Sequence, residues 1–246
     1  MPLALYTLSP SSPSDIDLLK ATGTIHLHAF LTNEVNRYIF YGPPSSYPAI
    51  AEANRARHEK SLREDPTVRI VVIIDTDIPA SDAQQDSPAI EQVIAFIKYN
   101  IYESAKVETE SKDREWPSYT NIPLVSYFWG CIVDARRALF EKHGPHVLIG
   151  NVATSPDHMR RGAGRMLMQH AVDEADKRGM TAHLEASPEG FHLYESLGFR
   201  QVGEFWTDLE RFENGGDKGD GYDPKRRQGV GEGWYMEAIM TRPKQS

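Results

Sequence analysis

Residues 146–179 decide the fold of this chain, and they read HVLIGNVATSPDHMRRGAGRMLMQHAVDEADKRG. The first nine, His146–Thr154, are mostly aliphatic and β-branched, which predicts a strand that ends at Ser155 and Pro156. After a basic turn, small and apolar residues recur at the spacing of one helix face: Gly164, Leu167, Met168, Ala171, Val172 and Ala175. The segment therefore predicts a strand, a glycine-containing turn and a helix that stops before Gly179.

The turn between this strand and helix has the features of an anion site. Glycines let a ligand approach the backbone, and the first N–H groups of a helix have no partner within it, so the helix dipole favours an anion there. Arg160, Arg161 and Arg165 add positive charge at this point. Without an anion these cations would oppose the dipole, so we interpret the turn as a phosphate site rather than as a solvated basic helix end. It lacks the Gly-Lys-Ser/Thr of triphosphate-binding loops and the third glycine of dinucleotide-binding loops.

Composition limits the class of protein. The chain has 246 residues, 27 Lys and Arg against 35 Asp and Glu, a net charge of −8 and 40% hydrophobic residues, which is typical of an ordinary globular protein. The acidic balance disfavours a nucleic-acid partner. A lone Cys131 and an N-terminus without signal-peptide features predict an intracellular protein of the cytoplasm, with the nucleus as a further option. No apolar stretch approaches the roughly 18–20 residues of a membrane span, and no Cys/His framework indicates a metal.

The rest of the chain predicts alternating strands and helices. We expect helices at residues 15–30, 49–63 and 131–143, with Ser14 as the N-cap of the first. Between the first two lies an aromatic loop, residues 36–48. Strands are expected at residues 2–8, 67–74, 90–102, 181–186 and 233–241.

The phosphate turn resembles the acetyl-coenzyme A signature of the GCN5-related N-acetyltransferase (GNAT) superfamily. That signature is Gln/Arg-x-x-Gly-x-Gly/Ala, after a strand ending in Val-x-x-x-Pro. Here Val152 and Pro156 hold the strand end, Gly162 and Gly164 hold the glycines, and Met159 stands where the family prefers Gln or Arg. The family holds the pyrophosphate mostly by backbone N–H groups, so this departure should cost less than a lost glycine.

A second motif strengthens the resemblance. Residues 193–199 read LYESLGF, which is similar to the family's Leu-Tyr-x-x-x-Gly-Phe signature, and Ser187 and Pro188 predict the start of the helix that carries it. The two motifs follow in the family's order and spacing, and the resemblance is strong over residues 147–202. The strand end and residues 184–188, LEASP, also resemble a fungal-type branch with mostly unassigned substrates.

The resemblance implies the architecture of the whole chain. It implies an α/β fold with a mixed, largely antiparallel central sheet, helices on both faces, and a strand before the phosphate turn that splays away from its neighbour. A core domain of this family needs ~150 residues, the usual size of a single domain. We therefore expect one GNAT domain over residues 1–246, with inserts near residues 79–88, 103–145 and 208–232.

The resemblance also implies the reaction. Acetyl-CoA would donate its acetyl group directly, within a ternary complex, to a primary amine that we expect to belong to a small molecule. Tyr194 would protonate the departing thiolate, whereas the structural alternative is a core tyrosine on an amphipathic helix. Backbone groups of Val152, Ala153 and Thr154 would hold the pantetheine. The remaining cofactor contacts are expected at Met159, Arg160, Arg161, Gly162, Ala163, Gly164, Arg165 and Ser187, the last standing where the family favours Asn.

The general base and the acceptor leave alternatives open. Glu185 shares a strand face with His183 and lies nearer the splayed end, so we predict it as the base, against a structural carboxylate or a water chain. We expect the acceptor to contact the aromatic residues 38–47 and the connection 208–233. Two other functions remain open: a non-catalytic acyl-CoA sensor or scaffold, and a protein or peptide N-acetyltransferase. A homodimer is also compatible with the sequence.

Overall fold

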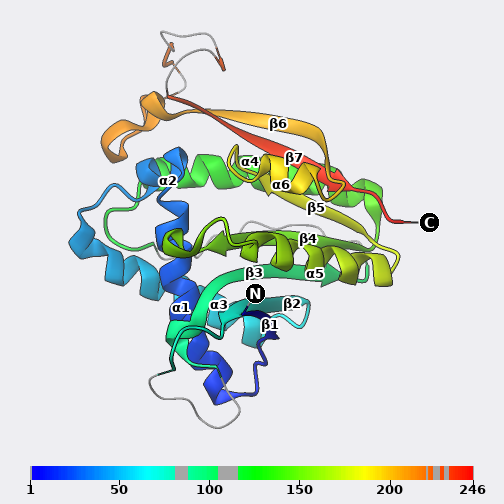
Figure 1. Cartoon of the computed structure of the whole chain (residues 1–246). Helices are drawn as coiled ribbons and strands as arrows, with labels where there is room; N and C mark the ends of the chain where they lie inside the picture. Colours follow the sequence, from blue (N-terminus) through cyan, green and yellow to red (C-terminus); the bar gives the residue numbers. More distant parts are fainter. Residues whose placement is uncertain are drawn as a thin grey trace.

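A computed structural model describes residues 2–80, 88–104, 116–219, 221–223, 228–229 and 233–245 (Figure 1). Parts of the three expected inserts, including residues 81–87, 105–115 and the basic run 225–227, lie outside these residues. The strands are β1 Leu3–Thr7, β2 Val68–Asp75, β3 Val93–Tyr102, β4 His146–Thr154, β5 Thr181–Ala186, β6 Arg200–Asp208 and β7 Trp234–Arg242. The helices are α1 Pro13–Phe30, α2 Glu34–Ile39, α3 Tyr47–Glu64, α4 Ile122–His143, α5 Ala163–Lys177 and α6 Phe191–Glu195. Short 3-10 segments are η1 Pro44–Ser46, η2 Ile90–Gln92, η3 Pro156–His158 and η4 Leu209–Gly215.

The seven strands form one sheet in the order β1-β2-β3-β4-β5-β7-β6. Every neighbouring pair is antiparallel except β4 and β5, which run parallel. The helix α5 connects these two parallel strands, as a crossover connection requires. The predicted mixed, largely antiparallel sheet is confirmed.

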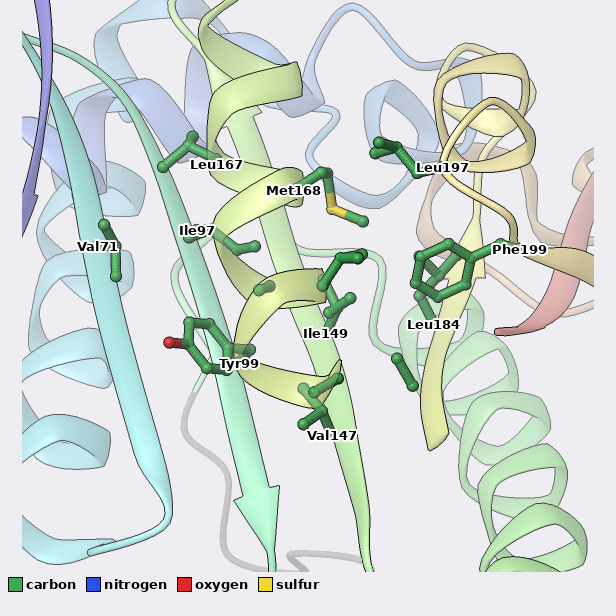
Figure 2. Packing of buried hydrophobic residues seen from close by; sticks show 14 of the residues in the cluster. Val71, Ile97, Tyr99, Val147, Ile149, Leu167, Met168, Leu184, Leu197 and Phe199 are labelled. Atoms are coloured by element: carbon green, nitrogen blue, oxygen red, sulfur yellow. The ribbon is translucent and has the colours of Figure 1, made fainter. Parts of the chain in front are cut away.

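Helices cover both faces of the sheet, as predicted. On one face α5 and α6 pack on side chains such as Val71, Ile97, Leu184 and Phe199 (Figure 2). On the other face α1 packs on a second cluster that includes Val72. Alternate residues of β2 thus enter different cores, which explains its uninterrupted apolar run. The helix face predicted for α5 is buried at Leu167, Met168, Ala171, Val172 and Ala175.

Two helices begin elsewhere than predicted. The N-cap of α1 is Ser12, not Ser14, because the Ser12 side chain accepts the N–H of Asp15. The helix α4 begins at Ile122 rather than at Cys131, because Asn121 caps it by accepting the N–H of Leu124. A single asparagine outside an apolar segment is a weak signal, whereas the structure shows its cap hydrogen bond directly.

Two loops also differ from the prediction. The first residues of the expected aromatic loop, 36–39, belong instead to the short helix α2, which begins at Glu34 and is capped by Asn33. The helix α6 begins at Phe191 rather than at Ser187, because residues 187–190 make a turn in which the Ser187 carbonyl accepts the N–H groups of Gly190 and Phe191. Proline at position 188 therefore serves a turn rather than the first turn of a helix.

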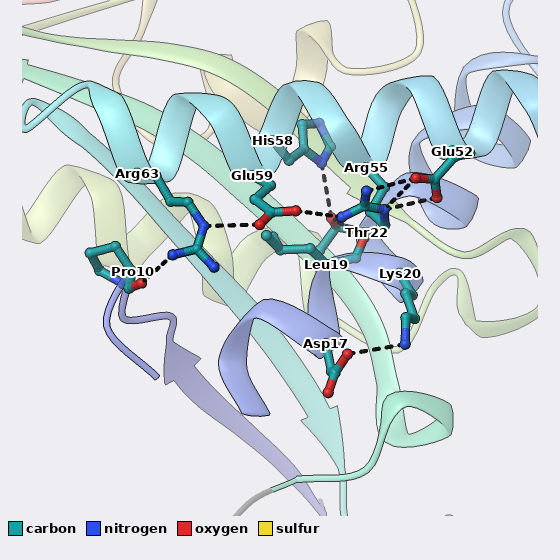
Figure 3. Close-up of polar contacts among 10 residues, drawn as sticks. All are labelled: Pro10, Asp17, Leu19, Lys20, Thr22, Glu52, Arg55, His58, Glu59 and Arg63. Atoms are coloured by element: carbon teal, nitrogen blue, oxygen red, sulfur yellow. Dashed lines mark hydrogen bonds and ion pairs between the residues drawn. The ribbon is translucent and has the colours of Figure 1, made fainter. Parts of the chain in front are cut away.

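The helices α1 and α3 pack against each other at very close range. A Cβ at Gly23 would lie 2.5 Å from the carbonyl oxygen of Ala51, so only glycine permits this approach. Figure 3 shows the polar contacts around it: the Thr22 hydroxyl lies 2.9 Å from Nδ1 of His58, and Arg55 bridges two glutamates of α3. The glycine that weakens helix propensity in α1 thus allows its packing.

We expect Gly23→Ala to lower the free energy of unfolding by about 1–3 kcal/mol, as overpacking does, although alanine is the better helix former. Urea denaturation measures the effect. Thr24→Ala, at the exposed neighbouring position, is the control and should stay within about 0.5 kcal/mol of the parent protein. A more stable Gly23→Ala variant would contradict the close packing.

Within the described part of the chain, no helix combines the length and the apolar character needed to span a membrane.

Candidate active site

The strands β4 and β5 separate toward their carboxyl ends. They pair only from His146 with Thr181 to Ile149 with Leu184. Beyond that point β4 continues to Thr154 along β3, and β5 continues to Ala186 along β7. The register of β4 against β3 shifts at Gly150, as in a β-bulge, which bends a strand. The predicted splayed strand is confirmed, and the backbone of residues 150–154 borders the opening.

The phosphate turn follows directly from the splayed strand. Gly162 is the N-cap of α5 with φ +88°, and no side chain caps the helix. A Cβ at Gly162 would meet nothing within 4 Å, so the space in front of this helix end is open. Arg160 also has a positive φ, +62°, which is rare for a residue other than glycine and marks a constrained loop. The uncapped helix end leaves backbone N–H groups for an anion, and the open space in front of it and the nearby cations suit a pyrophosphate.

The three arginines of the turn have different surroundings. Arg161 donates to Oδ2 of Asp75 at 2.7 Å, at the end of β2, so its guanidinium is held by a buried carboxylate. Arg165 donates to the hydroxyl of Ser196 at 3.0 Å, which links α5 to the segment after α6. Arg160 and the neighbouring Met159 are exposed. Of the three cations, Arg161 is thus tied to the scaffold, and direct contacts with a phosphate remain a prediction for each.

The small residues and the strand end are placed as the motif requires. Gly164 lies close to Thr154, because a Cβ at this position would be 3.7 Å from the Thr154 hydroxyl. Ala163 is buried in the core between α5 and the sheet. On β4, Val152 faces the α5 core and Ala153 faces the α1 core, so their backbone, not their side chains, is available to a ligand in the opening.

Tyr194 lies on α6 with its ring against Gly190. A Cβ at Gly190 would lie 2.7 Å from Cε2 of Tyr194 and 3.0 Å from its hydroxyl oxygen. Phe199 packs edge-on against the same ring, with centroids 6.3 Å apart. Burial raises the pKa of the Tyr194 hydroxyl, and the carboxylate of Glu237 raises it further. The hydroxyl therefore keeps its proton at physiological pH and is equipped to donate it.

We expect Gly190→Ala to reduce acetyl transfer by about tenfold or more, because the added methyl group displaces the Tyr194 ring. Acetyl-CoA binding should change little. Steady-state rates and calorimetric binding measure the two effects. Gly203→Ala is the control, since its Cβ would come no closer than 3.8 Å to any atom. Equal rates for the two variants would show that the position of this ring is unimportant.

Glu185 is engaged by an arginine. Its two carboxylate oxygens accept from Nε and Nη2 of Arg136 on α4 at 3.0 and 2.7 Å, and both side chains are buried. The guanidinium also lies over the ring of Trp129, 5.3 Å from its centroid. To take up a proton, Glu185 would have to give up part of this bidentate pair, so the geometry favours a structural role over that of the predicted base.

The structure adds a carboxyl group that sequence reasoning missed. Glu237 on β7 is 8% exposed, accepts a hydrogen bond from the Tyr235 hydroxyl at 2.9 Å, and neighbours Glu185 and Glu189 electrostatically. Burial raises its pKa to about 8, against the lowering effect of the Tyr235 hydrogen bond. The signal in the sequence was a glutamate in the middle of the apolar strand WYMEAIMTR. In the described ranges, no group of three or more His, Cys, Asp or Glu is arranged to hold a metal.

The segments expected to contact the acceptor lie together beside Tyr235. The helices α2 and α4 pack with η4 around a shared apolar cluster that includes Ile39, Leu124, Phe212 and Tyr235. Asn121 strengthens it by donating to the carbonyl of Phe212 at 2.6 Å. Residues 209–215 of the connection thus form a 3-10 segment with a kink at residues 212–214, and Leu209 and Phe212 pack in the same cluster as Tyr235.

Comparisons with known proteins point in the same direction. Residues 125–201 match the family model described as an acetyltransferase (GNAT) domain. Over 56 residues the chain is 47% identical to the [ribosomal protein bS18]-alanine N-acetyltransferase of Salmonella typhimurium. These 56 residues cover 21% of this chain and 38% of that protein. The chain thus spans about two fifths of the length of this curated relative.

Solved structures share the fold at low sequence identity. Arylalkylamine N-acetyltransferase 2 from Aedes aegypti superposes with a TM-score of 0.61 and 14% identity, over 99% of both chains. A histone acetyltransferase and related acetyltransferase from Corynebacterium glutamicum gives a TM-score of 0.52 and 18% identity, over 100% of this chain and 98% of that one. At these identities the likeness establishes the fold.

Proposed function

We propose that the protein transfers the acetyl group of acetyl-CoA to a primary amine, because residues 125–201 match the model of an acetyltransferase (GNAT) domain. The observation that carries the proposal is the separation of β4 from β5, because β4 leads to the uncapped, glycine-led end of α5 and Glu237 lies just beyond the end of β5, where it interacts electrostatically with Tyr194. One end of this site suits a pyrophosphate, and the other offers a proton donor and a buried carboxyl group.

Each residue of the proposed site has a separate task. The backbone N–H groups at the start of α5 bind the pyrophosphate, with Arg160 and Arg165 supplying charge. The free edge of residues 152–154 orients the pantetheine, and one of its N–H groups polarises the thioester carbonyl. Bound acetyl-CoA supplies an activated acyl group. Tyr194 gives its proton to the departing sulfur, and the raised pKa of its hydroxyl keeps that proton in place until the thiolate forms.

We propose a small-molecule amine as the acceptor. Glu237 is 8% exposed, and aromatic side chains lie beside it: Tyr235 donates to it and Phe205 is its cross-strand neighbour. Phe128 packs against both rings, with centroids 5.3 Å from Phe205 and 6.1 Å from Tyr235. A slender amine on an apolar carrier suits such a site, since a bulky polar chain would leave unpaired groups there.

A protein N-terminus is the second candidate acceptor. It is favoured by the 47% identity to an enzyme whose name states that it acetylates the alanine of a ribosomal protein, although the match covers 56 residues. A sensor or scaffold that binds acyl-CoA without turnover is the non-catalytic alternative. The test below separates all three.

The finer predictions from the sequence are part of the same proposal. We propose one decorated domain over residues 1–246, an intracellular location, and membership of the fungal-type branch on the basis of residues 184–188. The chain would act without nucleic acid, membrane or metal partners, either alone or as a homodimer.

Isothermal titration with acetyl-CoA, followed by a thiol-release assay, tests the function. We expect binding with a dissociation constant in the micromolar range, typical of enzyme substrates. The assay uses 2-phenylethylamine, n-butylamine, spermidine and a peptide beginning with alanine, and 2-phenylethylamine should react fastest. Fastest turnover of the peptide would select the protein acceptor, and binding without turnover would select the sensor. No binding at millimolar acetyl-CoA would refute the proposal altogether.

A further inference from the structure

We propose that Glu237 takes the proton of the acceptor's ammonium group and that Tyr235 and Asn33 position its carboxylate for this step. The inference rests on the acetyl transfer proposed above and assigns the proton acceptor of that reaction. It replaces Glu185 by a residue from a different strand, 52 positions further along the chain by residue number.

Glu237 lies where the sheet opens. The last pair between β5 and β7 is Ala186 with Ala238, so Glu237 is one residue beyond the end of β5, on the side where β4 has already diverged. Its neighbour on β6 is Phe205. The carboxyl group therefore lies at the edge of the proposed transfer site, with Tyr194 close enough to interact with it electrostatically.

A hydrogen-bonded chain orients the carboxyl group. Asn33 caps α2 by accepting the N–H of Val35 through its side-chain oxygen at 3.0 Å. Its amide nitrogen then donates to the Tyr235 hydroxyl at 2.7 Å and to Oε2 of Glu189 at 3.1 Å. Since Tyr235 accepts from Asn33, its own hydrogen is free to point at Oε2 of Glu237, 2.9 Å away. Tyr235, which is itself held by Asn33 from a distant part of the chain, thus keeps one carboxylate oxygen in place.

The other oxygen of Glu237 is available. Among the described residues, no donor contacts Oε1, although the side chain is 8% exposed and the groups around Oε2 are all paired. An oxygen without a protein donor, on a side chain that is largely buried, is open to a ligand, and an ammonium group provides both a hydrogen bond and a charge. Both oxygens of Glu185, in contrast, are occupied by Arg136.

The groups that face Glu237 determine its affinity for a proton. Burial has the largest effect and raises its pKa, the Tyr235 hydrogen bond lowers it, and the charges of Glu185 on β5 and Glu189 before α6 raise it. Together these effects give Glu237 a pKa of about 8, which is close to the working pH of an enzyme and suits a general base. Tyr194 of α6, which interacts electrostatically with Glu237, stays protonated, and Arg136 of α4 is paired with Glu185. The cross-strand neighbour of Glu237, Phe205, is apolar and packs against Phe128.

The proposed step balances in protons and bonds. Glu237 takes one proton from R–NH₃⁺ and leaves a neutral amine, whose lone pair forms the C–N bond to the acetyl carbonyl carbon. The C–S bond breaks, and Tyr194 gives its proton to the sulfur. The second proton lost by the nitrogen returns to Tyr194, and Glu237 releases the first to solvent. The products are the acetamide, free coenzyme A and one proton.

The first test measures the pH dependence of kcat/KM for 2-phenylethylamine in the wild type and in Glu237→Gln. In the wild type the rate should rise with pH through an ionisation near 8, because the carboxylate must be unprotonated to act as a base. Glu237→Gln should lose that ionisation and at least about 100-fold in kcat/KM, with acetyl-CoA binding within about twofold of the wild type. An unchanged profile in Glu237→Gln would overturn the inference. Failure of the wild type to bind acetyl-CoA would instead refute the function on which it rests.

The second test uses two variants that should shift the ionisation in opposite directions. Tyr235→Phe removes the hydrogen bond that lowers the pKa of Glu237, so its profile should move to higher pH. Glu189→Gln removes a charge that raises the same pKa, so its profile should move to lower pH. A merely structural role for Tyr235 would change the rate without moving the profile. Shifts in the same direction, or none, would contradict the positioning chain.

Infrared titration of the protein without substrates provides a readout independent of turnover and of the acceptor's identity. The difference spectrum of wild type minus Glu237→Gln should contain a protonated-carboxyl band that disappears near pH 8. If this band disappears near pH 4.5 instead, Glu237 is an ordinary carboxylate and the inference is wrong.

Discussion

Replacing Gly162 by valine should weaken acetyl-CoA binding by at least about tenfold, measured by isothermal titration. The backbone at this position has φ +88°, which a β-branched residue adopts only at a cost of about 1–3 kcal/mol. Relief of this strain would rotate the N–H groups of the first turn of α5 away from the phosphate position. The valine side chain would also project into the open space in front of the helix, where the pyrophosphate is proposed to lie.

Gly179→Val is the matched control for this variant. Gly179 follows the other end of the same helix, also has a positive φ of +62°, and its Cβ would likewise meet nothing within 4 Å. Both substitutions therefore introduce similar strain into α5, but only the one at Gly162 lies at the proposed phosphate site. Equal losses of binding would show that the effect comes from helix strain and would leave the phosphate site without support.

Replacing Tyr194 by phenylalanine should lower kcat by about 100-fold or more while acetyl-CoA binding stays nearly unchanged. The substitution removes the hydroxyl that protonates the leaving sulfur and keeps the ring that packs against Phe199. Because the pKa of this hydroxyl is raised, the wild-type rate should not fall from loss of the Tyr194 proton below about pH 10.

Tyr99→Phe serves as the comparison. Tyr99 is also a buried tyrosine whose pKa is raised, to about 12, but its hydroxyl lies 3.3 Å from Nε2 of His170 on α5 rather than at the sheet opening. Loss of this hydroxyl should leave kcat within about twofold. If Tyr194→Phe also keeps its full turnover, Tyr194 is a packing residue and another group, or water, protonates the sulfur.

The elements that the sequence predicted well are those with a strong local pattern. The helix face of α5, the β-branched run of β2 and the strand before the phosphate turn all lie within a few residues of their predicted bounds. The errors lie where one hydrogen bond decides the boundary, as at Ser12 of α1 and Asn121 of α4. A cap depends on the conformation of one side chain, and several residues nearby could have served equally well by type.

The candidate site also has parts that the sequence predicted and parts that it did not. The phosphate turn is contiguous in sequence, so its glycines and the splayed strand before it could be read from the residues themselves. The partners of its charged side chains could not be predicted from the sequence. Arg161 finds Asp75, and Glu185 finds Arg136, across 86 and 49 positions of the chain. The charge of a residue is visible in sequence, but its availability depends on which opposite charge the fold brings close.

The sequence by itself determined the strand, turn and helix that would receive the coenzyme, because backbone geometry at a phosphate site depends on short-range patterns of glycine and apolar residues. Only the tertiary structure distinguished Glu237 from Glu185, since this choice depends on Asn33, Tyr235 and Glu189 meeting from opposite ends of the chain. Burial and long-range hydrogen bonds set the proton affinity of a carboxyl group, and neither is encoded in its neighbours along the sequence.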